Sequence, residues 1–326
     1  MVPHEFDGLW PVRSPGAQHP RVPGDQRVRS VLLLVVHAGC CVRGEVRGVK
    51  PPMPYYGAKQ TLAERIVSFF PPHKHYVEPF CGSLAVLLAK EPSRMETVND
   101  LDGSVMTFWR VLRDRPLDLE RVCAFTPHSR AEYEACRDGE PAKDEIEVAR
   151  RVWVRLTQGR GGQLRRTTGW RHFKDPHGSS TSMPGYLEAY RQRFAPAAAR
   201  LIGVSLEARP ALELIKTYGG HRDALLYVDP PYLGSTRQWG NQYRHEMRSD
   251  DEHRDLAEAL RAADAAVVLS GYPSPLYDLE LYPDWDRLEL PTQNSQGGAR
   301  SARIEVLWSN RSLATADHLF TVEGIA

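Results

Sequence analysis

The sequence predicts an α/β protein built around a mostly parallel sheet. Short apolar runs rich in β-forming residues recur along the chain and are separated by helical patterns, as in parallel strands joined by crossover helices. A glycine turn at Gly82 joins one such strand to a helix, and the run 224–228 ends abruptly in Asp229, two prolines and Tyr232. Ligands of open α/β sheets bind just beyond the carboxyl ends of strands. These two turns are therefore where a functional site is expected.

The bulk composition is that of an ordinary globular protein. The 326 residues are 41% hydrophobic and 25% charged, enough for a sizeable core. The net charge is +1, so a nucleic-acid surface has to be a local patch. Five cysteines form no Cys-x-x-Cys pair, which favours a reducing compartment, and the apolar run 31–42 is too short to span a bilayer. A cytoplasmic location without membrane association is expected.

Residues 1–48 differ from the rest of the chain. They carry five prolines among scattered arginines and show neither a helical nor a strand period. We expect a disordered tail, or sequence upstream of the natural start with translation beginning near Val49 or Met53.

The predicted elements follow in order from residue 50. The apolar runs predict strands at 76–77, 97–98, 201–206, 224–228, 267–270, 288–290 and 304–307. The last two are expected to pair as an antiparallel edge. Helical periodicity predicts helices at 61–70, 84–90, 105–112, 186–194, 211–217 and 251–263. Seven acids and three bases over 130–147 indicate a solvated helical face.

The loop Glu78-Pro79-Phe80-Cys81-Gly82-Ser83 has features of a cofactor-binding turn. Gly82 permits close backbone approach, and the following helix offers free N–H groups. Asp100 ends the next strand, where an acid can hydrogen-bond ribose hydroxyls. No glycine-rich phosphate-binding motif is present, and the acid Glu78 would repel a phosphate. The pattern fits S-adenosylmethionine, a nucleoside cofactor without phosphate, but taken alone it is equally well explained as a structural turn.

The corner Asp229-Pro230-Pro231-Tyr232 is conformationally restricted. Both prolines restrict their own φ angles, and the first also restricts Asp229. The corner thus presents a carboxylate, the carbonyl of Pro230 and an aromatic ring. Taken alone, such a tetrapeptide is equally well explained as a turn with a solvated Asp229.

Residues 150–174 hold eight Lys or Arg and no acid, interleaved with glycines, glutamines and aromatics. Runs of charge are usually solvated faces, but this mixture favours contact with double-stranded DNA through phosphates and one or two guanine edges. The residues expected to contact DNA are Arg155, Gln158, Arg160, Arg165, Arg166 and Arg171, with Arg244 from the loop 233–249.

Four stretches, in this order, resemble the motifs of the Dam-like adenine-N6 DNA methyltransferases of phage and restriction-modification type. They are Pro54-Tyr55-Tyr56-Gly57-Ala58-Lys59, Glu78-Pro79-Phe80-Cys81-Gly82-Ser83, Asn99-Asp100-Leu101-Asp102 and Asp229-Pro230-Pro231-Tyr232. The resemblance extends over about 52–310. Four motifs in one order are far more specific than any one of them.

The resemblance implies a Rossmann-like sheet that binds S-adenosylmethionine and carries an inserted target-recognition domain. By position, 49–113 and 196–326 form the catalytic domain and 114–195 the insertion. The family implies that Tyr55, Lys59, Asp100 and Asp229 contact cofactor or substrate, and that the loop with Glu78, Phe80 and Gly82 binds the methionine end. It also implies a monomer that acts on DNA and, in restriction-modification systems, a cognate endonuclease.

The expected reaction is methyl transfer to the exocyclic amine of a flipped-out adenine. That amine is a poor nucleophile because its lone pair is delocalised into the ring. Asp229 and the carbonyl of Pro230 can each accept one amine N–H, which draws the nitrogen toward tetrahedral geometry. The fixed carboxylate also stabilises the charge that develops there. Tyr232 is expected to stack on the base, and no metal is needed.

Two departures from the family pattern and three alternatives accompany this prediction. Leu84 stands where relatives often have glycine, so the loop geometry is expected to differ. Arg209-Pro210 replaces an acid that contacts the cofactor's adenine in many relatives, so no adenine contact is assigned there. The alternatives are cytosine-N4 methylation, methylation of a protein or RNA amine, and a catalytically inactive DNA-binding relative. Asp229, rather than Ser or Asn, favours adenine.

Overall fold

The computed structural model describes residues 48–164, 168–173, 182–233, 247, 249–293 and 302–313. The expected tail therefore lies outside the described residues, apart from residue 48.

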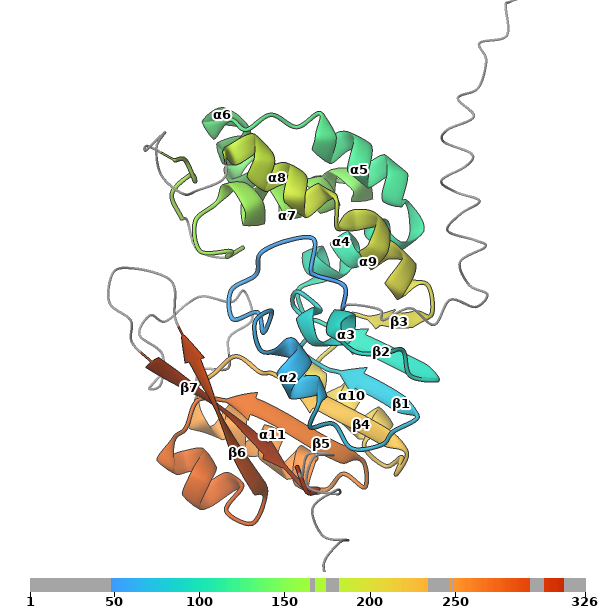
Figure 1. Cartoon of the computed structure of the whole chain (residues 1–326), viewed down its shortest axis with the longest axis vertical. Helices are drawn as coiled ribbons and strands as arrows, with labels where there is room; N and C mark the ends of the chain where they lie inside the picture. The colour runs from blue at the N-terminus through green and yellow to red at the C-terminus, as the bar shows by residue number, and fades with distance from the viewer. Residues whose placement is uncertain are drawn as a thin grey trace, which may run out of the picture. The chain divides into compact units, whose positions relative to one another are not determined.

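The described strands form one seven-stranded sheet in the order β3-β2-β1-β4-β5-β7-β6 (Figure 1). They are β1 (His75–Glu78), β2 (Met95–Asn99), β3 (Val204–Glu207), β4 (Ala224–Val228), β5 (Ala266–Gly271), β6 (Asp286–Gln293) and β7 (Ala302–Ser309). The strands from β3 to β5 are parallel, and β7 runs antiparallel to both β5 and β6. The predicted α/β class and the antiparallel edge are confirmed.

Helices cover both faces of the sheet. The first face packs against α2 (Ala63–Val67), α3 (Ala85–Ala89) and α4 (Gly103–Asp114), and the second against α10 (Ala211–Tyr218), α11 (Asp250–Arg261) and the π-helix η2 (Leu276–Leu281). Alternate residues of β4 supply the two cores: Leu225 and Tyr227 face the first, Leu226 and Val228 the second. A strand buried on both faces reads as a continuous apolar run, which explains the sequence of β4.

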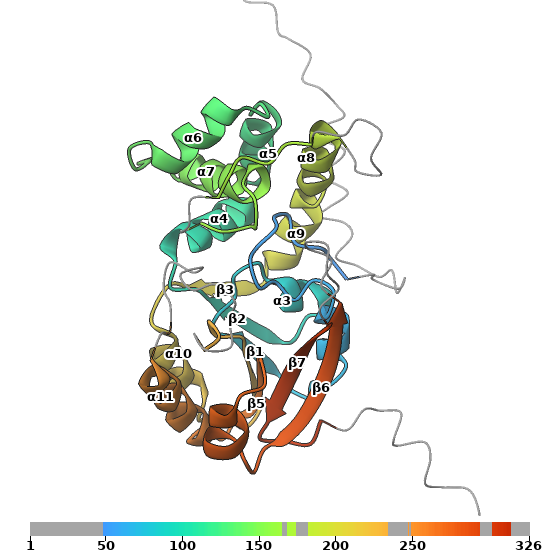
Figure 2. The same ribbon diagram turned by 90° about the vertical axis from the view of Figure 1, so that its left-hand side faces the viewer.

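More helices lie between α4 and β3. They are α5 (Pro116–Ala124), α6 (Arg130–Asp138), α7 (Glu145–Gln158), α8 (Met183–Arg191) and α9 (Phe194–Leu201). Figures 1 and 2 show α5 to α8 gathered near α4 and β3, away from the β6–β7 edge. Helix α7 packs along α4, and its Trp153 is fully buried, with its indole N–H donating to the carbonyl of Pro52 at 3.2 Å.

Three local predictions need correction. The strand expected at 201–206 begins at Val204, because the buried Ala197, Ala198 and Leu201 complete one face of α9. The segment 130–147 is more than a solvated face, since it contains α6 and the first turn of the partly buried α7. The π-helix η2 was not predicted. None of the described helices is long and apolar enough to cross a membrane.

Candidate active site

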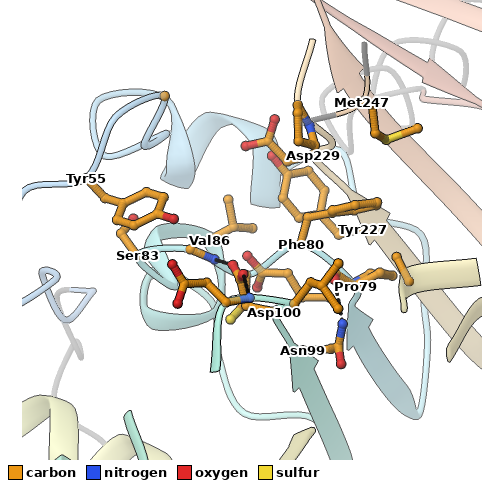
Figure 3. A pocket seen from close by; sticks show the side chains of 18 of the residues that line it. Tyr55, Pro79, Phe80, Ser83, Val86, Asn99, Asp100, Tyr227, Asp229 and Met247 are labelled. Carbon is orange, nitrogen blue, oxygen red and sulfur yellow. Dashed lines mark hydrogen bonds between the residues drawn. The ribbon is translucent and has the colours of Figure 1, made fainter. Parts of the chain in front are cut away.

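A cavity of about 310 Å³ lies at the carboxyl ends of β1, β2 and β4 (Figure 3). The strand order reverses between β1 and β4, so the loops that follow these strands diverge and leave a crevice. Every residue that the sequence proposed for cofactor binding lines this cavity: Tyr55, Lys59, Glu78, Phe80, Gly82, Asp100 and Asp229. The start of α10 (210–212) also lines it, although no contact was assigned there.

The turn at Gly82 requires a glycine for two reasons. Its φ is +42°, and a Cβ at this position would come within 2.9 Å of the Tyr55 ring. Hydrogen bonds fix the turn on both sides: the indole N–H of Trp109 donates to the Gly82 carbonyl at 2.9 Å, and the Gly82 N–H donates to Asp100 Oδ2 at 3.0 Å. The turn is therefore held rigidly against both Tyr55 and the end of β2.

Leu84 adopts the conformation that a glycine would favour. Its φ of +56° lies in the left-handed region, and its side chain is fully buried in the core. A non-glycine residue there costs about 1–2 kcal/mol, an amount comparable with what burying a leucine side chain contributes. The backbone at Leu84 thus keeps a left-handed geometry despite the substitution.

Asp100 links the turn at Gly82 to the turn that follows β2. Besides accepting from Gly82, its Oδ1 accepts from the N–H of Asp102 at 2.9 Å. Burial raises the pKa of Asp100 to about 6, against the opposing effect of these N–H donors. Each oxygen keeps a second acceptor position, which suits a pair of ribose hydroxyls.

Glu78 is a buried acid at the cavity wall. Burial raises its pKa to about 8, although the hydroxyl of Tyr76 donates to Oε2 at 2.8 Å and lowers it. Glu78 is therefore neutral at pH 7, which corrects one step of the sequence argument: a charged Glu78 does not repel phosphate. Any repulsion of a phosphate must therefore come from the other carboxyl groups of the lining.

Asp229 is the centre of a hydrogen-bonded cluster. The ammonium of Lys59 lies 2.8 Å from both carboxylate oxygens, and Oδ1 also accepts from the hydroxyls of Tyr232 at 2.9 Å and Ser270 at 3.0 Å. Oδ2 has Lys59 as its described partner, which leaves one acceptor position, and Asp229 lines the cavity. Pro230, behind it, is buried.

Tyr232 contributes its hydroxyl to this cluster and its ring to an aromatic contact. The ring lies edge-on to Tyr272, with centroids 4.7 Å apart, and the Lys59 ammonium sits 4.9 Å from its centroid. Stacking of this ring on a base remains a prediction.

Glu305 on β7 is a site residue that the sequence analysis missed. Its side chain is 6% exposed, its Oε1 accepts from Tyr232, and it lies 3.5 Å from the Lys59 ammonium. Burial raises its pKa to about 7, with Lys59 opposing the rise and Asp229 adding to it. The available signal was an acid inside the apolar run 304–307; only the pairing of β7 with β5 brings it to the corner.

The basic segment begins as the later part of α7, and beyond Gln158 its described residues pair as a hairpin. Gly159 and Trp170 pair as an antiparallel bridge, flanked by hydrogen bonds from Arg160 N to Gly169 O and from Arg171 N to Gln158 O. The Trp170 ring stacks with both His128 and His172, and the guanidinium of Arg130 lies 5.0 Å from its ring centroid.

The residues expected to contact DNA divide into three groups. Arg160 is exposed, and Arg171 is half-buried over the ring of Tyr186. Gln158 is fully buried, bonding Pro127 O and Ser129 N, so its side chain cannot reach DNA, and Arg155 bonds the carbonyl of Leu164. Arg165, Arg166 and Arg244 lie outside the described residues.

The hairpin touches the amino-terminal motif directly. The N–H of Tyr56 donates to the carbonyl of Gly162 at 2.8 Å. Gly162 has a φ of +62°, and a Cβ there would lie 3.3 Å from the backbone of Tyr55. Tyr55 therefore lies between Gly162 of the hairpin and Gly82 of the cofactor turn.

The chemistry of the cavity fits S-adenosylmethionine. Lys59 is the single Lys or Arg among the described residues of the lining, whose other charged residues are all acidic. A phosphate would meet carboxyl groups there, whereas a cationic sulfonium would be attracted. Within the described ranges, no group of three or more His, Cys, Asp or Glu side chains is arranged to hold a metal ion.

Comparisons with known proteins give similar structures and a matching family. Solved structures that match include precorrin 8w decarboxylase from Methanobacterium thermoautotrophicum, at 11% identity and TM-score 0.34, over 81% of this chain and 96% of that one. Precorrin-6y C5,15-methyltransferase from Geobacter metallireducens matches at 8% identity and TM-score 0.30, over 78% of this chain and 86% of that one. No curated protein sequence matches. The family model of D12 class N6 adenine-specific DNA methyltransferases matches residues 55–275, well over half of the chain.

Proposed function

This chain belongs to the D12 class N6 adenine-specific DNA methyltransferases, and on that premise we propose that Asp229 is the residue at which a flipped-out adenine of a specific DNA site is methylated. The observation that carries the proposal is the position of Asp229. Its carboxylate lines the nucleoside-sized cavity and keeps an acceptor position, while Lys59, Tyr232 and Ser270 fix it by hydrogen bonds.

The residues proposed to hold the cofactor are those of the two turns and the amino-terminal motif. Asp100 would accept the ribose hydroxyls, and the turn Glu78 to Gly82, with Phe80, would bind the methionine end beside Tyr55. The lining residues Pro210, Ala211 and Leu212 offer an apolar surface for an adenine ring. When bound, S-adenosylmethionine supplies an electrophilic methyl group.

The corner is proposed to activate the base. Asp229 Oδ2 and the carbonyl of Pro230 each accept one N–H of the adenine amine, which directs its lone pair into the cavity. The carboxylate then stabilises the positive charge that develops on the nitrogen. The ring of Tyr232 would stack on the extruded base and offset part of the few kcal/mol that unstacking costs.

The hairpin 158–171 is proposed as the DNA-contacting surface of the insertion 114–195. Arg160 is exposed there, and Arg130, His128 and His172 surround Trp170. Guanidinium groups on such a surface neutralise phosphates and position the duplex. We propose that one monomer suffices for one strand.

Sequencing that detects modified bases in single molecules tests this proposal. DNA from cells that express the chain should carry N6-methyladenine at one short sequence, and DNA from cells expressing Asp229→Asn should not. Methylation at random adenines would refute site specificity, and an unmodified genome would refute the activity on cellular DNA.

A further inference from the structure

The hydroxyl of Tyr232 lies between two carboxyl groups. It is 2.9 Å from Asp229 Oδ1, and it also contacts Glu305 Oε1. A hydroxyl carries one hydrogen, and an ionised carboxylate can only accept. Both contacts are hydrogen bonds only when one of the two carboxyl groups carries a proton. Asp229–Tyr232–Glu305 is therefore a chain along which a proton can be exchanged.

When the chain holds one proton, the charges of the cluster place that proton on Glu305 rather than on Asp229. Lys59 contacts both oxygens of Asp229 at 2.8 Å but approaches Glu305 only to 3.5 Å. One ammonium neutralises one carboxylate, and a second buried negative charge is costly. The pKa of Glu305, about 7, means that both of its protonation states are populated near neutral pH. Burial and the two carboxyl groups hold the pKa of Tyr232 well above its ordinary value, so the hydroxyl keeps a proton to pass on.

We propose that Glu305 is the terminal proton acceptor of the methyl transfer, reached from Asp229 through the hydroxyl of Tyr232. This inference rests on the proposed role of Asp229. Because Glu305 acts through Tyr232 and does not touch the base, it is a positioning residue. In the described part of the chain, the titratable groups that interact with it include Lys59, Asp229, Tyr232 and Tyr227.

The proton balance of the reaction requires such an acceptor. The amine nitrogen forms a bond to the methyl carbon while the methyl–sulfur bond breaks, its electron pair staying on sulfur. The nitrogen then holds one proton more than the N6-methyladenine product. That proton passes to Asp229, Asp229 gives it to the Tyr232 oxygen, and the hydroxyl hydrogen of Tyr232 moves to ionised Glu305. Glu305 later releases it to solvent.

Glu78, a buried carboxyl group of the cavity wall whose pKa is also raised, is not the acceptor. Its described side-chain hydrogen bond is to the hydroxyl of Tyr76, which is no part of the chain from Asp229. Its pKa of about 8 also keeps it neutral at pH 7, so it already carries the proton it would have to receive.

The first test is the pH dependence of turnover in Glu305→Gln. Glutamine keeps the shape and an acceptor for Tyr232 but cannot take up a proton. We expect kcat to fall by roughly 10- to 100-fold, while the KM values for DNA and cofactor stay within about threefold. The rise of wild-type kcat with pH through about 7 should be absent in the variant. Glu289→Gln, an exposed acid on β6 that pairs with Arg287, serves as the control and should match wild type.

Tyr232→Phe gives a second variant that keeps the ring and removes the relay hydroxyl. It should lose kcat to a similar extent, and the double variant should lose little more, because the two residues act in one chain. A Glu305→Gln enzyme with the wild-type kcat and pH profile would overturn the relay. Turnover by Asp229→Asn would instead overturn the proposed function itself, so the two failures are distinguishable.

Infrared spectroscopy of the protein without cofactor supplies a readout besides activity. The C=O stretch of a protonated carboxyl group should disappear from the wild-type spectrum as pH rises through about 7 and should be missing in Glu305→Gln. Glu78→Gln identifies the separate band of Glu78, which should persist to about pH 8. A carboxylic-acid band unchanged by Glu305→Gln would show that Glu305 does not hold the proton and would contradict the proposal.

Discussion

The ammonium of Lys59 lies 2.8 Å from both carboxylate oxygens of Asp229, although 170 positions separate the two residues in the chain. Burial alone would lower the pKa of Lys59, but Asp229 and Glu305 raise it to about 12. The lysine therefore stays charged under all working conditions. It joins the amino-terminal motif to the corner after β4 and sets the charge of the cluster.

Lys59→Met should inactivate the enzyme near neutral pH. The change removes the cation but keeps the length of the side chain, so Glu305 loses the charge that holds its pKa down to about 7. Glu305 then ionises only at higher pH, and the rising limb of kcat moves to higher pH. We expect a loss of roughly 100-fold at pH 7. Lys74→Met, at an exposed ion pair with Asp223, is the control, and a Lys59→Met enzyme with normal kcat would refute this role.

Gly162→Ala should weaken cofactor binding although Gly162 does not line the cavity. A methyl group there would press on the backbone of Tyr55 at 3.3 Å, and Tyr55 packs against the cofactor turn at Gly82. We expect the Kd for S-adenosylmethionine, measured by calorimetry, to rise by roughly three- to tenfold.

Gly161→Ala is the matched control for that prediction. Its φ is +82°, so alanine meets a similar backbone strain, but a Cβ there would find nothing closer than 3.9 Å. If both variants weaken cofactor binding equally, the effect comes from hairpin strain and not from Tyr55.

Glu78→Gln should remove part of the pH dependence of stability. The folded protein holds a proton on Glu78 up to about pH 8, whereas the ordinary value is 4.5. The native state therefore binds more protons than the unfolded state between these values, and wild-type stability falls as pH rises through this window. Since one pKa unit corresponds to about 1.4 kcal/mol, the variant should gain a few kcal/mol relative to wild type between pH 4 and pH 9.

Denaturant unfolding at the two pH values measures this difference. Glu64→Gln, at an exposed position of α2, should show the same pH dependence as wild type. A Glu78→Gln variant whose stability parallels that of wild type over the whole window would mean that Glu78 is ionised in the folded protein.

Arg160→Ala should weaken DNA binding uniformly across sequences. The side chain is exposed on the hairpin, where a phosphate contact is expected. Loss of one such contact should reduce affinity by roughly three- to tenfold and lower the salt dependence by about one counterion. Arg94 is exposed just before the amino end of β2, whereas the cavity lies at the carboxyl ends of the strands. Arg94→Ala should therefore change neither quantity. An unaltered salt slope for Arg160→Ala would exclude that contact.

The cavity residues could be predicted because their signals are local. Glu78 ends a strand and Gly82, Asp100 and Asp229 follow one, and parallel strands bring their carboxyl ends to one side of the sheet. The resemblance then added Tyr55 and Lys59, which no local pattern connects to the sheet.

What the sequence could not show depends on long-range pairing. Glu305 reaches Asp229 only because β7 inserts between β5 and β6, a register that an isolated strand pattern does not specify. Gln158 was assigned to DNA because of its basic neighbours, yet the hairpin folds its side chain inward onto Pro127 and Ser129. A run of arginines does not reveal which of them pair with nearby acids, as Arg150 of α7 does with Glu132 of α6 and Glu147 of its own helix.

The most direct test of the account is the fate of a labelled methyl group. Purified wild-type protein and Asp229→Asn would be incubated with duplex DNA and S-adenosylmethionine carrying an isotopic methyl label, and the DNA would be digested to nucleosides for mass spectrometry. The account predicts label in N6-methyladenine alone for wild type, and a decrease of at least about 100-fold for Asp229→Asn with DNA binding retained. Label in N4-methylcytosine, or undiminished adenine methylation by Asp229→Asn, would contradict it.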